Sequence, residues 1–402
     1  MRDPRLQKLA KVLVEYSVEV KPGQIVRITG EPVALPLLEE IYEAAVKAGA
    51  HPYLKCAPDS LQGIFFEHAS DEQLAFVSPL AMQEVETIDV SIGLWAETNT
   101  KALSRVDPKR QGKLSAARKP IFKIFMTRAA AVDDPEGNPG VRPLWWVGTL
   151  FPTQASAQDA EMSLRQYEDF VFKAGHLDLD DPVAAWRAIE KRQQKVVDYL
   201  TGRKVVRFQS PNGTDLTVNV EGMRWINCCG KANFPDGEVF TGPNLKAADG
   251  GVNGVVRYSF PAVYRGQEAH GIELHFEKGR VKKATATKGE KYLLEMLDQD
   301  EGARALGEIA IGTNYQIQQY SKNTLFDEKI GGTFHAAVGA GYPETGNSNE
   351  SGLHWDMVCD LRSPAHGGVE KAGGTITVDG EVISRDGRFV FEGWPGPGGS
   401  EA

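Results

Sequence analysis

The stretch that decides the fold of the first half is residues 24–56, QIVRITGEPVALPLLEEIYEAAVKAGAHPYLKC. Gln24 to Ile28 has the extended, apolar pattern of a β-strand. Apolar positions from Leu35 to Ala48 recur at helical spacing, and Gly49 ends that predicted helix. Pro52 to Cys56 predicts a second strand. Because strand and helix alternate, we expect an open α/β domain with a largely parallel sheet.

The same alternation continues after this stretch. The β-branched run TIDVSI at residues 87–92 predicts a third strand, from Thr87 to Leu94. Two further helices are predicted, from about Ala157 to Lys173 and from Pro182 to Leu200. Neither a GxGxxG sequence nor a Walker-type loop follows any of the predicted strands. A nucleotide cofactor is therefore not expected.

From Lys204 onward the pattern changes. Short β-rich segments alternate with Pro, Gly, Asn and Asp turns, and one amphipathic helix is predicted from about Lys291 to Arg304. A chain of 402 residues also exceeds the size at which a single core stops growing. We therefore predict an α/β domain over residues 1–200 and a β-rich domain over residues 201–402 that carries the chemistry.

Composition narrows the classes of function. The net charge of -9 argues against a broad nucleic-acid-binding surface. No run of 18 apolar residues is present, and the N-terminus lacks the apolar segment of a secretion signal, so no membrane association is expected. The four cysteines form no CxxC pair and fit a reducing setting, which predicts a cytoplasmic protein.

Four short segments of the second half contain side chains of the types that bind metal ions. They are GEVFTGP at residues 237–243, LGEIA at 306–310, TFH at 333–335 and LHWDM at 353–357. Carboxylate and imidazole ligands together suit Zn, Co or Mn. If these side chains meet in space, they can bind more than one divalent ion and activate water against an amide bond. The candidates are Glu238, Glu308, His335, His354 and Asp356, with the phenol of Tyr342 beside them.

Each candidate alone is a weak signal. On a strand, His354 and Asp356 would lie on one face, but a His–Asp hydrogen bond in a sheet is as common as a metal site. Glu308 opens an apolar run and is costly to bury unless it is paired or metal-bound. A glutamate such as Glu238, at a turn before a strand, is usually solvated, and a loop tyrosine such as Tyr342 is usually structural. Only the combination favours a two-metal site.

These segments resemble the M29 family of metal-dependent aminopeptidases, of the aminopeptidase T type. The resemblance extends to residues 327–335, DEKIGGTFH, to YPETG at 342–346, and to GTLFPTQ at 148–154 followed by DAEMS at 159–163. It implies an N-terminal α/β domain, a β-rich C-terminal catalytic domain and homodimers whose active sites face an internal cavity. It also places the family's metal ligands at Glu238, Glu308, His335, His354 and Asp356, and its active-site tyrosine at Tyr342.

The leading hypothesis is thus a cytoplasmic metallo-aminopeptidase that uses two divalent ions (Zn, Co or Mn) on peptides with a free N-terminus. Tyr342 would stabilise the oxyanion. Glu308 would either bridge the ions or transfer a proton to the leaving amine, and the sequence leaves both roles open.

Two other hypotheses compete with it. If only His335, His354 and Asp356 bound a single iron, the scaffold would resemble a non-haem ring-cleaving dioxygenase, and Glu238 and Glu308 would not be needed. A peptide- or metal-binding relative without turnover is the third possibility. The presence of all five candidate ligands and the phenol argues against it.

Overall fold

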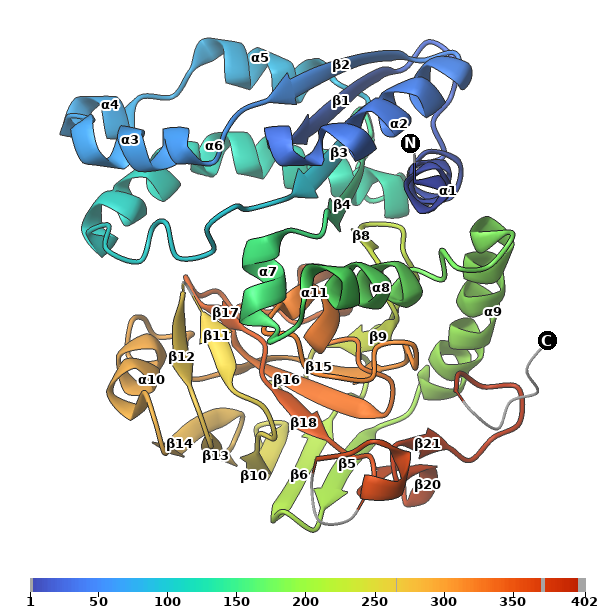
Figure 1. The fold of residues 1–402 in the computed structure, drawn as a ribbon. Helices are drawn as coiled ribbons and strands as arrows, with labels where there is room; N and C mark the ends of the chain where they lie inside the picture. Colours follow the sequence, from blue (N-terminus) through green and yellow to red (C-terminus); the bar gives the residue numbers. More distant parts are fainter. Residues whose placement is uncertain (1–2, 265, 370–372, 397–402) are drawn as a thin grey trace. The chain divides into compact units, whose positions relative to one another are not determined.

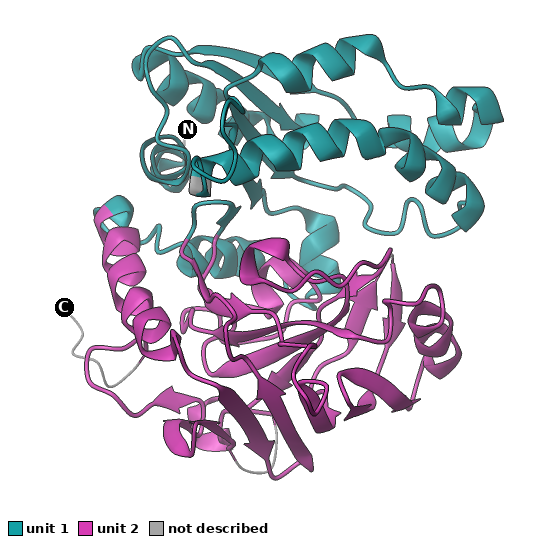
Figure 2. Cartoon of the chain, turned by 180° about the vertical axis from the view of Figure 1, so that it is seen from behind, with its two compact units in different colours: residues 1–183, 230–234 teal, residues 184–229, 235–402 magenta. Residues whose placement is uncertain are grey.

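The computed structural model describes residues 3–264, 266–369 and 373–396 (Figure 1). The chain divides into two compact units, coloured separately in Figure 2. The first contains Met1–Val183 and Gly230–Phe234, and the second contains Ala184–Cys229 and Pro235–Ala402. The assignment of domains to residues 1–200 and 201–402 stays a prediction.

A five-stranded sheet forms the centre of unit 1. Its order is β2-β1-β3-β4-β8, and every neighbouring pair is parallel. This arrangement confirms the open α/β fold expected from residues 24–56, since parallel strands need crossover connections. The strands are β1 (Ile25–Gly30), β2 (His51–Cys56), β3 (Val90–Trp95), β4 (Trp145–Leu150) and β8 (Asn233–Phe234).

One predicted helix of unit 1 is two helices in the structure. The single helix expected from Ala157 to Lys173 is wrong: α7 ends at Asp159, and α8 begins at Leu164. The break is local, because the Ser163 hydroxyl accepts the backbone N–H of Gln166 at 3.3 Å and caps a new helix. The helices are α1 (Pro4–Val12), α2 (Leu35–Lys47), α3 (Ser60–His68), α4 (Asp71–Ala75), α5 (Pro79–Thr87), α6 (Pro108–Asp133), α7 (Gln154–Asp159) and α8 (Leu164–Ala174).

Unit 2 is β-rich, as predicted. After α9 (Pro182–Leu200), an eight-stranded sheet has the order β14-β13-β10-β6-β5-β19-β20-β21. Its strands are β5 (Val205–Ser210), β6 (Thr214–Asn219), β10 (Val252–Arg257), β13 (Glu273–Glu277), β14 (Arg280–Thr285), β19 (Thr375–Val378), β20 (Glu381–Arg385) and β21 (Arg388–Phe389). A separate hairpin pairs β11 (Ala262–Tyr264) with β12 (Gln267–Ala269).

The predicted helix from Lys291 to Arg304 is shorter than expected. In the structure α10 spans Glu290–Leu297, and the residues that follow form turns. The Arg304 guanidinium donates to the Asp298 carboxylate at 2.7 Å, which folds this segment back on itself. The helical spacing of the sequence therefore continued past the point where the helix ends.

A second sheet of unit 2 has the order β17-β16-β15-β9-β7, and β18 also pairs with β16. Its strands are β7 (Ile226–Cys228), β9 (Glu238–Thr241), β15 (Leu306–Gly312), β16 (Thr333–Gly339), β17 (His354–Trp355) and β18 (Val358–Asp360). All of its pairings are antiparallel. We call this the site sheet, because its residues include four of the five candidate metal ligands.

The two faces of the site sheet have opposite chemistry. Side chains alternate between faces along a strand. One face is apolar and belongs to the main core of unit 2; it carries Val239, Ile309, Ile311, Phe334, Ala336 and Val338. The register places the remaining side chains on the other face, which carries Glu238, Glu308, His335 and His354 among the small residues Ala310, Gly312 and Ala337.

The described part of the chain has no helix whose length and apolar character would let it cross a membrane.

A stacked aromatic pair lies between the two large sheets of unit 2. Phe208 of β5 and Phe334 of β16 stack with ring centroids 4.1 Å apart, and both side chains are fully buried.

We expect Phe334→Ala to lower the free energy of unfolding by about 3–5 kcal/mol, measured by urea denaturation. Val390→Ala, at a half-exposed position, is the control and should change it by less than about 0.5 kcal/mol. Equal effects of the two substitutions would contradict this account of the core.

Candidate metal centre

Four neighbouring strands of the site sheet each contribute one candidate ligand. Glu238 lies on β9, Glu308 on β15, His335 on β16 and His354 on β17. The register pairs Glu238 with Gly312 and His335 with Ala310, so small side chains leave space above the middle of the sheet. The four candidates therefore converge because the strand period places them on one face.

Asp356 joins this group from outside a strand. The sequence predicted a continuous strand through His354 and Asp356, and that detail is wrong: β17 ends at Trp355 and β18 begins at Val358. The two side chains still meet, with His354 Nε2 and Asp356 Oδ1 3.3 Å apart.

The candidate ligands lie in direct contact with one another. Glu308 extends its two oxygens to different imidazoles: Oε1 lies 3.3 Å from His335 Nε2, and Oε2 lies 3.3 Å from His354 Nε2. Asp356 Oδ1 is also 3.6 Å from His335 Nε2. One ligand atom each from Glu308, His335 and Asp356 fall within 4.8 Å of one another.

Backbone carbonyls orient both imidazoles. His354 Nδ1 lies 2.8 Å from the carbonyl oxygen of Ala340, and His335 Nδ1 lies 3.3 Å from that of Glu328. If each Nδ1–H donates to its carbonyl, each Nε2 keeps a lone pair directed at the carboxylates. This is the usual arrangement of metal-binding histidines.

A bulge in β15 helps to place Glu308. The register between β15 and β16 shifts between Leu306 and Glu308. Gly307 fills this position because an added Cβ would lie 2.2 Å from the carbonyl oxygen of Ala340. The close approach brings the strand that carries Glu308 next to the carbonyl that orients His354.

Glu238 provides the strongest evidence that this group can bind a cation. Its Oε2 atom is buried without a hydrogen-bond partner and lies 3.7 Å from His335 Nδ1. Burial raises the pKa of the Glu238 carboxyl to about 8, against the opposing effect of Lys329. A buried carboxylate oxygen with no donor is costly, and a divalent ion would satisfy it. The donor set thus fits a metal centre.

The charges of the surrounding side chains also favour the binding of a cation. Burial alone would lower the pKa of both histidines, but the surrounding carboxylates raise that of His335 to about 10 and that of His354 to about 12. Three of five carboxylates lie near the Lys329 ammonium; with all five ionised and both imidazoles neutral, as when they bind metal, four negative charges would remain uncompensated. The carboxylates are Asp236, Glu238, Glu308, Glu328 and Asp356.

Tyr342 lies at the edge of this group. Its ring packs edge-to-face against His354, with centroids 5.0 Å apart, and against Phe240 at 5.4 Å. Burial, followed by the nearby carboxylates, raises the pKa of the Tyr342 phenol well above its usual range. The phenol therefore stays protonated and can donate a hydrogen bond.

Three charged residues of the centre, Asp236, Glu328 and Lys329, were not identified as functional candidates from the sequence. Lys329 is fully buried; its ammonium contacts the Glu328 carboxylate and lies 3.4 Å from Glu238 Oε1 and 4.0 Å from Asp236 Oδ1. The run Asp327-Glu328-Lys329 between apolar Phe326 and Ile330 was a usable signal, because charges inside an apolar stretch are costly to bury unpaired.

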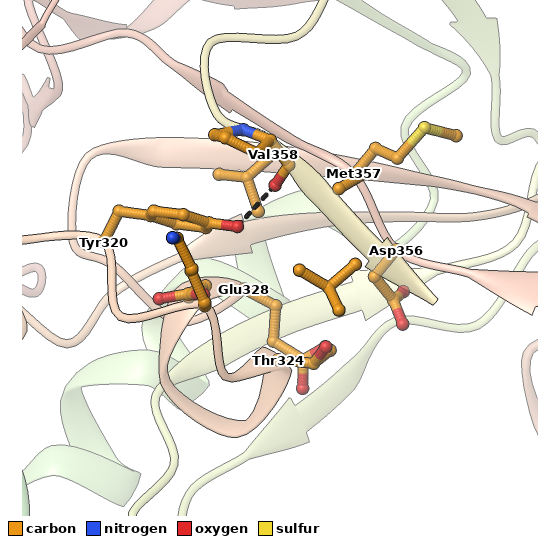
Figure 3. A pocket seen from close by; sticks show the side chains of 11 residues that line it. Tyr320, Thr324, Glu328, Asp356, Met357 and Val358 are labelled. Carbon is orange, nitrogen blue, oxygen red and sulfur yellow. Dashed lines mark hydrogen bonds between the residues drawn. The ribbon is translucent and has the colours of Figure 1, made fainter. Parts of the chain in front are cut away.

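A small pocket opens beside the centre (Figure 3). Asp356 and Glu328 line it, together with Tyr320, whose hydroxyl donates to the Pro261 carbonyl at 2.6 Å. Its volume of about 20 Å³ is enough for a water molecule. The pocket therefore gives solvent a place next to two half-buried carboxylates of the group.

Comparison with known proteins gives a consistent result over the whole chain. Residues 2–389 match the sequence profile of the family described as Thermophilic metalloprotease (M29). Aminopeptidase 2 of Geobacillus stearothermophilus is 30% identical, over 97% of this chain and 98% of its own length. Aminopeptidase T of Thermus thermophilus is 29% identical, over 86% of this chain and 87% of its own.

Two solved structures share the fold. Wild-type AmpT from Thermus thermophilus superposes with a TM-score of 0.80 at 25% identity, covering 96% of this chain and 99% of that one. The 2,5-dihydroxypyridine dioxygenase from Pseudomonas putida KT2440 superposes with a TM-score of 0.55 at 14% identity, covering 96% of each chain. The second likeness concerns the fold alone.

The geometry predicts which histidines hold metal. We expect His354→Ala to remove about one divalent ion per chain, because its Nε2 faces both Glu308 and Asp356. Elemental analysis after dialysis measures this. His68→Ala, at a side chain 71% exposed in unit 1, is the control and should keep the full metal content. Full metal content in His354→Ala would rule out His354 as a ligand.

Proposed function

Because the chain belongs to the M29 family of metalloproteases, we propose that it is a metal-dependent aminopeptidase, which releases single residues from peptides with a free N-terminus. One observation carries the proposal: four adjacent strands direct Glu238, Glu308, His335 and His354 onto one face, where Glu308 reaches both imidazoles. Such a donor set is suited to divalent metal ions that act on an amide bond.

We propose that the centre holds two divalent ions. The two oxygens of Glu308 point to different imidazoles, as a bridging carboxylate would. Two divalent cations would also balance the four uncompensated negative charges of the centre. Mixed carboxylate and imidazole ligands suit Zn, Co or Mn. The proposed ligands are Glu238, Glu308, His335, His354 and Asp356.

Bound ions of this kind lower the pKa of water and polarise a carbonyl group. The residues of the chain supply the rest of the proposed mechanism. Tyr342 donates its phenol proton in a hydrogen bond to the carbonyl oxygen as negative charge develops there. We propose that Glu308 acts as a metal ligand, and that Glu328, which lines the pocket beside Asp356, takes a proton from the attacking water and passes it to the leaving amine. Burial raises the pKa of the Glu328 carboxyl, which suits a group that takes up a proton.

A carboxylate beside the pocket would recognise the amine of the substrate. A peptide with a free N-terminus brings an ammonium group, and the half-buried Asp356 carboxylate, which lines the pocket, can accept a charge-assisted hydrogen bond from it. We expect N-acetylated peptides to be hydrolysed at least about 100-fold more slowly than the same peptides with a free amine, because the acetyl group removes that hydrogen bond. Steady-state kinetics on matched pairs measure this. Equal rates would contradict recognition of the amine.

Tyr342 is proposed to act in the chemical step. We expect Tyr342→Phe to lower kcat about 100-fold or more and to change KM little, because the lost hydrogen bond forms mainly in the transition state. Tyr42→Phe, at an exposed position on α2 of unit 1, is the control. A loss confined to KM would assign Tyr342 to substrate binding instead.

The dioxygenase alternative needs only His335, His354 and Asp356 around one iron. Against it, a single ion on those three residues would leave the buried Glu238 Oε2 without a partner. Metal analysis separates the two functions: about two ions per chain favour the peptidase, and about one iron favours the dioxygenase. Metal-loaded protein that is inert on a panel of peptides would favour a binding protein without turnover.

We further propose a homodimer located in the cytoplasm. The dimer follows from the family resemblance, and the location follows from four cysteines that are all free thiols in the structure. Analytical ultracentrifugation that finds a single chain mass would contradict the dimer, and fractionation of cells that finds the chain outside the cytoplasm would contradict the location.

A further inference from the structure

Lys329 has surroundings that the proposed mechanism does not use. Its side chain is fully buried, and no other lysine among the described residues is buried. Its ammonium contacts Glu328 and lies 3.4 Å from Glu238 Oε1 and 4.0 Å from Asp236 Oδ1. A buried ammonium is costly, and three carboxylates around it offset that cost. The chain thus places a fixed positive charge beside a proposed metal ligand.

The backbone holds this charge firmly in place. The N–H of Asn314 donates to the carbonyl of Lys329 at 3.0 Å, and the side-chain amide of Asn314 donates to the carbonyl of Asp236 at 2.8 Å. The turn before Glu238 packs directly on the same residue. Gly237 has φ +128°, and an added Cβ would lie 2.6 Å from the Asn314 Cβ. Asn314 therefore connects the backbone of Lys329 to that of Asp236, one of its acidic partners.

Lys329 also stands beside a second set of metal-type ligands. One ligand atom each from Cys228, Asp236 and Glu238 fall within 4.8 Å of one another, and Cys228 pairs with Glu238 across strands β7 and β9. By composition this set could hold a divalent ion. The lysine ammonium already lies close to two of its three members. The Lys329 ammonium thus occupies the position in which this set would hold a cation.

The two carboxylate oxygens of Glu238 consequently have different surroundings. Oε1 faces the ammonium, and Oε2 is the buried atom without a hydrogen-bond partner. Glu308, by contrast, has both oxygens directed at the imidazoles. An ion held by Glu238 would share that carboxylate with Lys329 and would be repelled by its charge, because like charges interact strongly inside a protein.

We propose that Lys329 is a positioning residue that keeps a divalent ion out of the Cys228–Asp236–Glu238 set and weakens the ion held by Glu238 Oε2. This inference rests on the proposed metal centre. It makes the two metal positions unequal: one ion is bound tightly by Glu308 and the imidazoles, and the other is bound weakly and exchanges. The activity then depends on the free concentration of divalent metal, through the occupancy of the weaker position.

Equilibrium dialysis of the metal-free enzyme against Mn²⁺ alone tests this. In the wild type we expect two ions, or one ion and a second too weak to saturate, with affinities at least about tenfold apart. In Lys329→Met, which keeps the length of the side chain and removes the charge, we expect the weaker ion to bind at least about tenfold more tightly. Lys291→Met, at a side chain 92% exposed, is the control and should match the wild type.

The direction of the change separates the proposal from a merely structural role. Loss of a structural lysine would weaken both ions, whereas loss of a competing charge strengthens one of them. If Lys329→Met does not fold, the wild-type titration still decides, because two ions of equal affinity would overturn the proposal. An unchanged or weaker second ion in folded Lys329→Met would overturn it as well. If the wild type bound no Mn²⁺, the metal centre itself would be contradicted.

Discussion

The burial of several carboxylates at one place is the constraint on which the rest of this structure depends. Two acidic side chains and two imidazoles on one face of the site sheet meet three carboxylates from adjoining segments, and a single lysine is the only buried ammonium among the described residues there. Negative charges at such short distances repel one another strongly where water is excluded. The group therefore needs cations, which are supplied either by protonation of the two imidazoles, whose pKa values are raised, or by bound metal ions. The unpartnered oxygen of Glu238 marks one position where such a cation is needed.

The fold meets this constraint by separating the two faces of one sheet. The apolar face of β9, β15 and β16 belongs to the core of unit 2 and supplies the stability. The opposite face is free to carry charged groups because the alternation of side chains separates the two functions residue by residue. In β15 the side chain of Glu308 lies in the candidate metal centre, and that of the next residue, Ile309, lies in the core. The site can thus be highly charged without weakening the packing beneath it.

Much of this was predictable from the sequence. The run from Leu306 to Gly312 has one glutamate among apolar and small residues, which is the pattern of a buried strand with one functional side chain. The candidate ligands were found by their chemical type and order. Short-range signals also gave α2 and the parallel strands of unit 1.

Other features depend on contacts between distant segments, and the sequence pattern could not supply them. The interruption between β17 and β18 and the bulge at Gly307 follow from how neighbouring strands meet. The role of Lys329 follows from its distance to Asp236, a residue more than 90 positions earlier in the chain. Similarly, the break between α7 and α8 depended on a cap at Ser163, which the apolar spacing alone did not indicate.

The most direct test of this account is the number of metal ions and their ligands in a crystal of the metal-loaded enzyme. Anomalous scattering measured at the Mn, Co and Zn absorption edges gives both. The account predicts two anomalous peaks on the charged face of the site sheet, with Glu308 between them and Glu238, His335, His354 and Asp356 as further ligands. An absence of peaks there, or one iron held by His335, His354 and Asp356 alone, would contradict it.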